Sequence, residues 1–123
     1  MIDRIRLTAA AKVQLSTLKR KTGIEHYNSL CRHALCLSLA NASMPPEEEL
    51  NFNGGVEIDW RTFAGGHETL YLNIIMMRVA QDGYAVNEES VKKACAGHLH
   101  RGLSYLASKG DDYLYSSLAM IGR

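Results

Sequence analysis

Proline, cysteine and long hydrophobic runs are scarce in this sequence of 123 residues. The two prolines are adjacent, at Pro45 and Pro46, and the three cysteines lie within hydrophobic helical patterns rather than at turns. An odd number of cysteines at such positions argues against a disulfide framework. No stretch approaches the roughly 20 apolar residues that span a bilayer, and the N-terminus lacks the hydrophobic region of a secretory signal. We therefore expect a cytoplasmic protein with buried, reduced thiols and no membrane association.

The composition is that of an ordinary globular protein. Hydrophobic residues make up 46% of the chain and charged residues 22%, and a chain of this length can bury a core without a disulfide or a metal. There is no internal repeat and no low-complexity tract. We expect one domain spanning residues 1–123.

The charges are unevenly distributed, although the formal net charge is only +1. Residues 1–33 contain seven basic and two acidic residues, a net charge of +5, whereas residues 41–70 contain one basic and six acidic residues, a net charge of −5. Such asymmetry indicates an acidic partner for the first third of the chain, with nucleic acid as the first candidate. The acidic middle is then either solvated or paired with another copy.

The hydrophobic pattern predicts an all-α bundle of about five helices with a short N-terminal strand. Residues 4–7 alternate polar and apolar side chains, as in a half-exposed strand. A helix capped by Thr8 follows and ends at Gly23. Further helices are predicted over residues 25–42, 67–81 and 88–109, and from Asp111 onward. Residues 47–66 are predicted to form a long loop with one short strand. Gly97 and Gly102 are expected to allow close approach between helices.

Five residues invite a test for a metal site: Cys31, Cys36, Cys95, His98 and His100. The first two cysteines are five residues apart and the two histidines are two apart, so the side chains of each pair point to different helical faces. We interpret these residues as core packing and expect no metal and no cofactor.

Catalytic signals are weaker still. A thiol nucleophile at Cys31 or Cys36 would gain from the positive charge of Arg32, but buried cysteine usually acts as a small hydrophobe. Residues 65–68, Gly-Gly-His-Glu, resemble a phosphate-holding turn at a helix N-terminus. They lack the lysine and the spacing of a Walker loop, so a simple tight turn is the favoured interpretation. No catalytic residue is assigned.

The basic residues of the first helix are the strongest signal. Lys12 and Lys19 lie seven residues apart on one side of that helix, away from its leucines, and Arg20 and Lys21 extend the charge around its last turn. Cations there also complement the helix dipole, and a charged face is often only solvated. Seven basic residues exceed what the dipole requires, so phosphate binding is favoured. The candidate DNA-binding residues are Arg4, Arg6, Lys12, Lys19, Arg20, Lys21 and Arg32.

Two other functions remain open. A strand followed by two helices is also the order in ribbon-helix-helix repressors, whose paired strands enter the major groove as a dimer. Arg4 and Arg6 would then point outward and read bases, which predicts a transcriptional regulator. A scaffold protein would instead use the broad apolar faces of the helices predicted over residues 25–42 and 67–81 to join enzyme partners.

Three runs of the sequence resemble the DndE family of the bacterial DNA phosphorothioation system: RIRLTAAAKVQLSTLKRKTGI, NSLCRHALCLSLA and GGVEIDWRTFAGGHETLY. The resemblance implies an all-helical oligomer, expected to be a homotetramer. It implies work beside a cysteine desulfurase, an ATP-using sulfur-transfer enzyme and an ATPase that together replace a non-bridging phosphate oxygen of DNA with sulfur. It also implies binding to double-stranded DNA, with a preference for nicked duplex, and no catalytic activity of its own.

Overall fold

The N-terminal strand forms as predicted, but its partner comes from the same chain. The computed structural model describes residues 1–109, in which β1 (Arg4–Leu7) pairs antiparallel with β2 (Val56–Asp59). Ile5 and Leu7 point into the core, whereas the two arginines of β1 are exposed. The all-α prediction is therefore corrected to a mostly helical fold with a small two-stranded sheet. The pairing between two copies that the ribbon-helix-helix analogy predicts is replaced by pairing within one chain.

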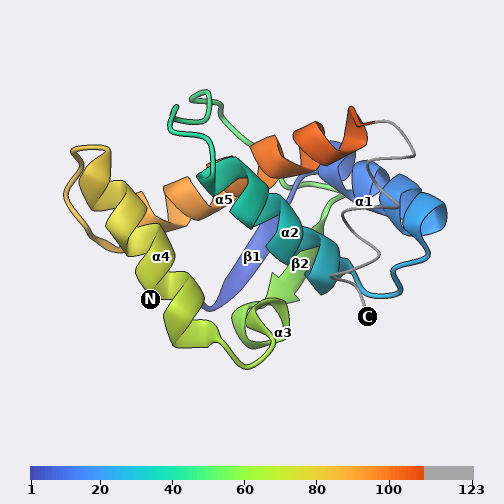
Figure 1. Ribbon diagram of the computed structural model, residues 1–123, viewed down its shortest axis with the longest axis horizontal. Coiled ribbons are helices and arrows are strands. Elements are labelled where there is room, and N and C mark those ends of the chain that lie inside the picture. The colour runs from blue at the N-terminus through green and yellow to red at the C-terminus, as the bar shows by residue number, and fades with distance from the viewer. Residues whose placement is uncertain (110–123) are drawn as a thin grey trace.

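The sheet is accompanied by five helices in the described part of the chain (Figure 1). They are α1 (Ala9–Thr22), α2 (Tyr27–Leu39), α3 (Trp60–Ala64), α4 (Glu68–Gln81) and α5 (Glu88–Ala107). The predicted boundaries of α1, α4 and α5 agree with the structure to within two residues, but α2 is shorter than predicted at both ends and α3 was not predicted. The helix predicted from Asp111 onward lies outside the described residues. No helix within residues 1–109 is long and hydrophobic enough to cross a membrane.

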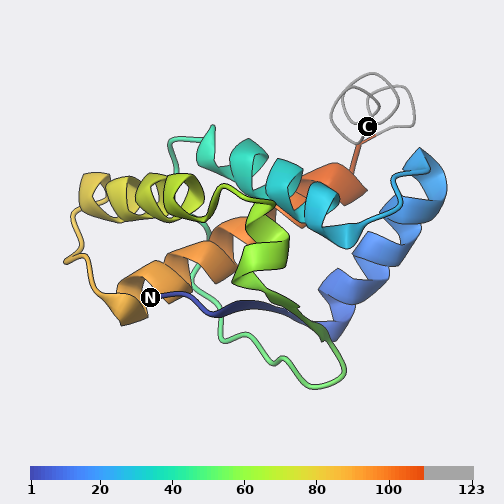
Figure 2. The same ribbon diagram turned by 90° about the horizontal axis from the view of Figure 1, so that it is seen from below.

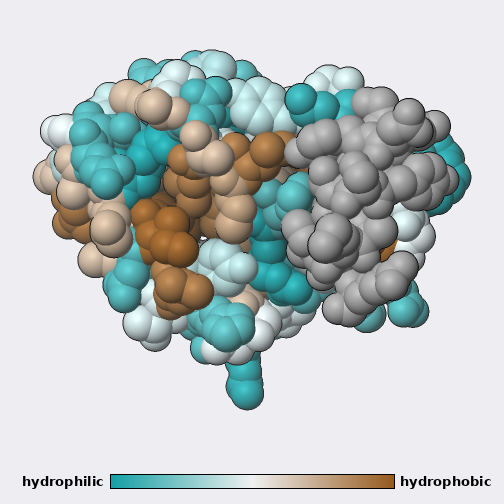
Figure 3. All heavy atoms as spheres, in the orientation of Figure 1, coloured by the Kyte–Doolittle hydropathy of each residue, from teal (hydrophilic) through white to brown (hydrophobic). Residues whose placement is uncertain are grey.

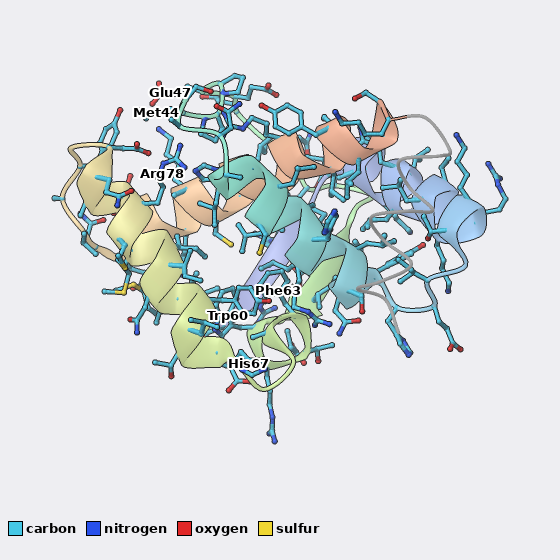
Figure 4. All side chains as sticks on the ribbon, viewed as in Figure 1. Met44, Glu47, Trp60, Phe63, His67 and Arg78 are labelled. Carbon is cyan, nitrogen blue, oxygen red and sulfur yellow. The ribbon has the colours of Figure 1, made fainter. Side chains whose placement is uncertain are left out.

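Helix α3 replaces part of the predicted loop and joins the sheet to α4. Trp60 and Phe63 are buried on one side of it, and their rings stack with centroids 5.1 Å apart (Figure 4). The rings of Phe63 and of Tyr71 in α4 also pack edge-to-face, with their centroids 5.5 Å apart. Gly65 ends the helix in the left-handed conformation, with φ of 57°. Trp60 is thus a core residue, whereas His67 is exposed at the start of α4.

Helix α5 is the central element, and the other long helices pack around it. Gly102 of α5 faces the backbone of α2 so closely that a β-carbon would clash with the carbonyl of Ala34, which confirms its predicted role. Gly97 faces Pro45 of the loop after α2 rather than a helix. In Figure 2, α1 forms one end of the molecule and α4 the other, with α5 running between them. The most basic helix and the most hydrophobic helix therefore lie at opposite ends.

Two buried arginines explain why α2 ends before the prolines. Arg78 points from α4 toward the end of α2 (Figure 4) and donates to four carbonyl oxygens at distances between 2.8 and 3.2 Å, those of Leu39, Asn41, Ala42 and Ser43. Arg101 donates to the carbonyl of Ser38 at 2.8 Å. Guanidinium groups so placed satisfy carbonyls that a helix end leaves without partners and oppose the negative end of its dipole.

Candidate nucleic-acid interface

The outer face of α1 presents cations to solvent. The Thr8 hydroxyl accepts the Ala11 N–H at 3.1 Å to start the helix, and its inner face buries Ala11, Leu15 and Leu18. The opposite side carries four exposed basic residues: Lys12, Lys19, Arg20 and Lys21. Within residues 1–109, no ion pair forms at the first three of these. This face can therefore accept phosphates without first breaking an internal ion pair at those three residues.

Part of the positive charge on α1 also stabilises the helix itself. Lys19, Arg20 and Lys21 stand in its last turn, where the helix dipole is negative. Each such contribution is worth only about 0.3–1 kcal/mol at an exposed site and weakens with salt. So weak an interaction with the dipole does not prevent Lys19 or Arg20 from binding an external anion.

Arg4 and Arg6 are brought to the outer face of the sheet, where both bind one carboxylate. Arg4 donates to Glu57 of β2 at 3.1 Å and Arg6 donates to the other oxygen of that carboxylate at 2.9 Å. The hydrogen bond from Arg4, with a second one from Arg6, lowers the pKa of the Glu57 carboxyl below its usual range. The Arg6 guanidinium also lies 5.3 Å from the centre of the Phe52 ring. The acidic middle of the chain thus offsets part of the basic N-terminus within one protomer.

Arg32 stands apart from the α1 residues and has structural contacts. It is half-buried on α2, donates to the carbonyl of Phe63 at 2.8 Å and to the hydroxyl of Ser29 at 3.2 Å. The first bond ties α2 to α3. Of the seven predicted DNA-binding residues, the structure gathers four on α1, places two against Glu57 and uses one to join helices.

Beside the cations of α1 lies a shallow hollow of about 540 Å³. It is lined by Ser16, Lys19, Arg20, Gly23, Ile24, Glu25 and Tyr27. The Lys19 ammonium lies 5.6 Å from the centre of the Tyr27 ring, and the Tyr27 hydroxyl is 2.9 Å from the Ser16 hydroxyl. The hydrophobic pattern of residues 25–42 marks Tyr27 only as one of the apolar positions of a predicted helix. The spacing of Lys12 and Lys19 does not predict this hollow, because the hollow is formed by the turn between α1 and α2.

The cysteines divide into two environments. Cys31 and Cys95 are buried as predicted, and burial raises the pKa of each thiol to about 12. Cys36 is exposed, so the prediction of three buried thiols is wrong for this residue. Partial desolvation nevertheless raises the pKa of the Cys36 thiol, and the charge of Arg32 lowers it by less. None of the three resembles an activated thiolate, which requires a lowered pKa.

The histidines that were weighed as metal ligands have other partners. His98 lies 2.8 Å from the Ser38 hydroxyl in the core, and His100 accepts the Thr8 N–H and bonds to the carbonyl of Ala96. No group of three or more His, Cys, Asp or Glu side chains that could hold a metal ion comes together between residues 1 and 109. Ser38 and His98 form a serine–histidine pair, but both are buried and the serine also accepts from Arg101 at 2.8 Å. We therefore interpret this pair as structural.

The chain is similar to a known protein family and to solved structures. The family described as DNA sulphur modification protein DndE matches residues 4–112. The crystal structure of DndE from Escherichia coli B7A, a protein involved in DNA phosphorothioation modification, is similar with a TM-score of 0.67 and 24% sequence identity. The aligned region covers 86% of this chain and 99% of that one. No curated protein sequence matches the chain.

Proposed function

The chain belongs to the DndE family of DNA sulphur modification proteins, and we propose that it serves that modification as a non-catalytic subunit that binds duplex DNA. The observation that carries the proposal is the outer face of α1, where Lys12, Lys19 and Arg20 are exposed and make no ion pair within residues 1–109. The bound duplex, nicked in its preferred form, would be positioned in the cytoplasm for sulfur incorporation by partner enzymes.

Phosphate contacts from α1 explain binding without sequence readout. Lysine and arginine that neutralise phosphates release counterions, and this term is independent of base sequence. The sheet is a poor reader of bases, since Arg4 and Arg6 are both bound to Glu57. These two arginines and Arg32 are therefore secondary contacts in the proposal. The structure gives no comparable support to the alternative of a ribbon-helix-helix regulator.

Assembly is proposed for the other end of the molecule. Leu70 and Met77 of α4 are 54% and 61% exposed, and hydrophobic side chains gather over and beside α4 in Figure 3. Exposed hydrophobic patches commonly mark contacts between proteins. We propose that this face joins copies into the homotetramer, or contacts the sulfur-modification enzymes, while α1 stays free for DNA. Sedimentation of the native protein and of a Leu70→Glu, Met77→Glu variant tests whether this face joins copies. If it does, the variant should sediment as an assembly of lower mass.

The test of the DNA-binding proposal compares two charge reversals of equal size. One variant carries Lys19→Glu, Arg20→Glu and Lys21→Glu on α1; the control carries Arg61→Glu, Lys92→Glu and Lys93→Glu, which are exposed residues of α3 and α5. Fluorescence anisotropy with intact and nicked duplexes should show at least a tenfold loss of affinity for the first variant and a much smaller loss for the control. Equal losses would show that only net charge matters and that α1 is not the binding face.

A further inference from the structure

We propose that the hollow between α1 and α2 binds a single unpaired nucleotide of DNA. This inference rests on the proposed DNA-binding function and adds a second contact to it, one that reads whether a base is free of the duplex. The hollow has a volume of about 540 Å³, within the usual range of small-ligand sites. It opens beside the same cations that are proposed to hold the phosphates.

Tyr27 supplies a platform for the base. The side chain of Tyr27 is half-buried against the core, and its hydroxyl lies 2.9 Å from the Ser16 hydroxyl, which holds the side chain in the lining of the hollow. The Lys19 ammonium now lies 5.6 Å from the ring centre. A base that stacks on the ring takes the place of this cation. The flexible lysine side chain then turns to the phosphate of the same nucleotide.

The charges around the hollow set the direction of the nucleotide. Lys19 and Arg20 are exposed on the α1 side, whereas Glu25 stands on the side of the turn. The carboxylate of Glu25 repels phosphate, and it accepts hydrogen bonds from the amino groups of bases. The phosphate is therefore placed toward α1 and the base toward Tyr27 and Glu25.

The turn that shapes the hollow is built by hydrogen bonds and does not depend on a ligand. The Thr22 hydroxyl donates to the carbonyl of Leu18 at 2.7 Å and accepts the Ile24 N–H at 3.2 Å. Gly23 adopts a φ of 72°, which side chains other than hydrogen disfavour. The backbone of the site is thus preformed and the Lys19 side chain alone turns aside, which lowers the entropy lost on binding.

An unpaired nucleotide fits these features better than a bare phosphate or an intact duplex. A phosphate alone would leave the ring of Tyr27 unused. Bases within a duplex are stacked on each other and cannot reach the ring. Aromatic rings beside cations are the common means of binding single-stranded nucleic acid, because every base offers a face for stacking.

The test uses two duplexes of one sequence, one fully paired and one with a single unpaired nucleotide at a strand end. The native protein should bind the second at least fivefold more tightly. Tyr27→Leu should abolish that preference and leave affinity for the paired duplex unchanged, while Tyr84→Leu, an exposed tyrosine after α4, should keep it. A preference retained by Tyr27→Leu overturns the inference. Failure of the native protein to bind either duplex overturns the proposed DNA-binding function instead.

A second measurement needs no variant and so does not depend on how Tyr27→Leu folds. When 5-iodouracil is placed at the unpaired position and irradiated in complex with the native protein, the cross-link should map by mass spectrometry to Tyr27. A cross-link that maps only to residues outside the hollow contradicts the inference.

Discussion

Arg6 and Glu57 face each other across the two strands, and the Nε atom of Arg6 donates a hydrogen bond of 2.9 Å to a carboxylate oxygen of Glu57. Arg4 binds the other oxygen of the same carboxylate. One acidic residue from the middle of the chain therefore holds two of the seven cations that the sequence assigns to DNA. All three side chains are exposed, so the charge of Glu57 can be removed with little effect on the fold.

Glu57→Gln should strengthen DNA binding, because it frees two arginines at the surface without removing a core group. We expect a severalfold higher affinity, and a salt slope that is steeper by about 0.9 for each arginine that then reaches a phosphate. Glu49→Gln removes the same charge from an exposed loop residue for which no arginine contact is seen, and serves as the control. Equal affinity for Glu57→Gln and Glu49→Gln would show that Arg4 and Arg6 lie away from the DNA.

Stability should fall with acidity between about pH 6.5 and pH 4, mainly because of His98. Burial, together with the charges of Arg78 and Arg101, lowers the pKa of His98 to about 4, with Asp82 acting in the opposite direction. The unfolded chain keeps a histidine pKa of about 6.5, so it takes up the proton first as the pH falls, and unfolding becomes more favourable. The pKa of His33 is also lowered by burial, which adds to the same trend.

Through His98, the free energy of unfolding should fall by up to about 3 kcal/mol once the pH reaches 4, and it should not change above pH 7. Urea denaturation at pH 7 and pH 5 measures the difference. Substitution of the exposed His67 by Gln is the matched control and should leave the pH dependence unchanged, whereas His98→Gln should flatten it. A native protein equally stable at both pH values would contradict the assignment.

Gly102→Ala should be strongly destabilising, because the added methyl group would clash with the backbone of Ala34 and push α2 away from α5. Overpacking of this kind costs about 1–3 kcal/mol or more. Gly97→Ala lies in the same helix, where the new carbon would meet only Pro45 at 3.4 Å. Alanine gains up to about 1 kcal/mol in helix propensity over glycine, which should offset the cost of this contact and leave the stability of Gly97→Ala nearly unchanged. Chemical denaturation of both variants checks this order, and a Gly102→Ala variant as stable as Gly97→Ala would contradict the close packing.

Arg78→Lys should also be destabilising, although it keeps the charge. The guanidinium serves four carbonyls at the end of α2 and also donates to Asp82, and a lysine ammonium has only three donors and no planar fork. We expect a loss of about 1–3 kcal/mol in stability, because carbonyls that the ammonium does not reach lose their hydrogen-bond partner. Hydrogen exchange should localise the loss to the last turn of α2. Unchanged protection there would mean that the prolines alone end this helix.

The sequence predicted most helices because their signals are local. Thr8 and Gly23 mark the ends of α1, and Asn87 caps α5 by accepting the Ser90 N–H at 2.9 Å. Helix α3 was missed although Trp60, Phe63 and Ala64 stand at helical spacing, because the surrounding turn residues favoured a loop. The early end of α2 could not be predicted, since it depends on Arg78, which is 39 residues away from Leu39 along the chain.

The candidate site was predictable only as a set of charges. Exposure of the cations on α1 follows from helical periodicity, since the buried leucines fix which side faces solvent. Periodicity does not predict that Arg4 and Arg6 are separated from the cations of α1, because their contacts with Glu57 span more than 50 residues. The hollow beside Tyr27 likewise depends on the geometry of a turn and on a contact between two helices.

The dependence of DNA affinity on salt concentration tests the central claim most directly. If Lys12, Lys19 and Arg20 each neutralise a phosphate, the logarithm of the association constant should fall against the logarithm of salt concentration with a slope of about −2.7 or steeper. The measurement needs only the native protein, an intact duplex and a series of salt concentrations. A slope near zero, or no binding at low salt, would contradict the account.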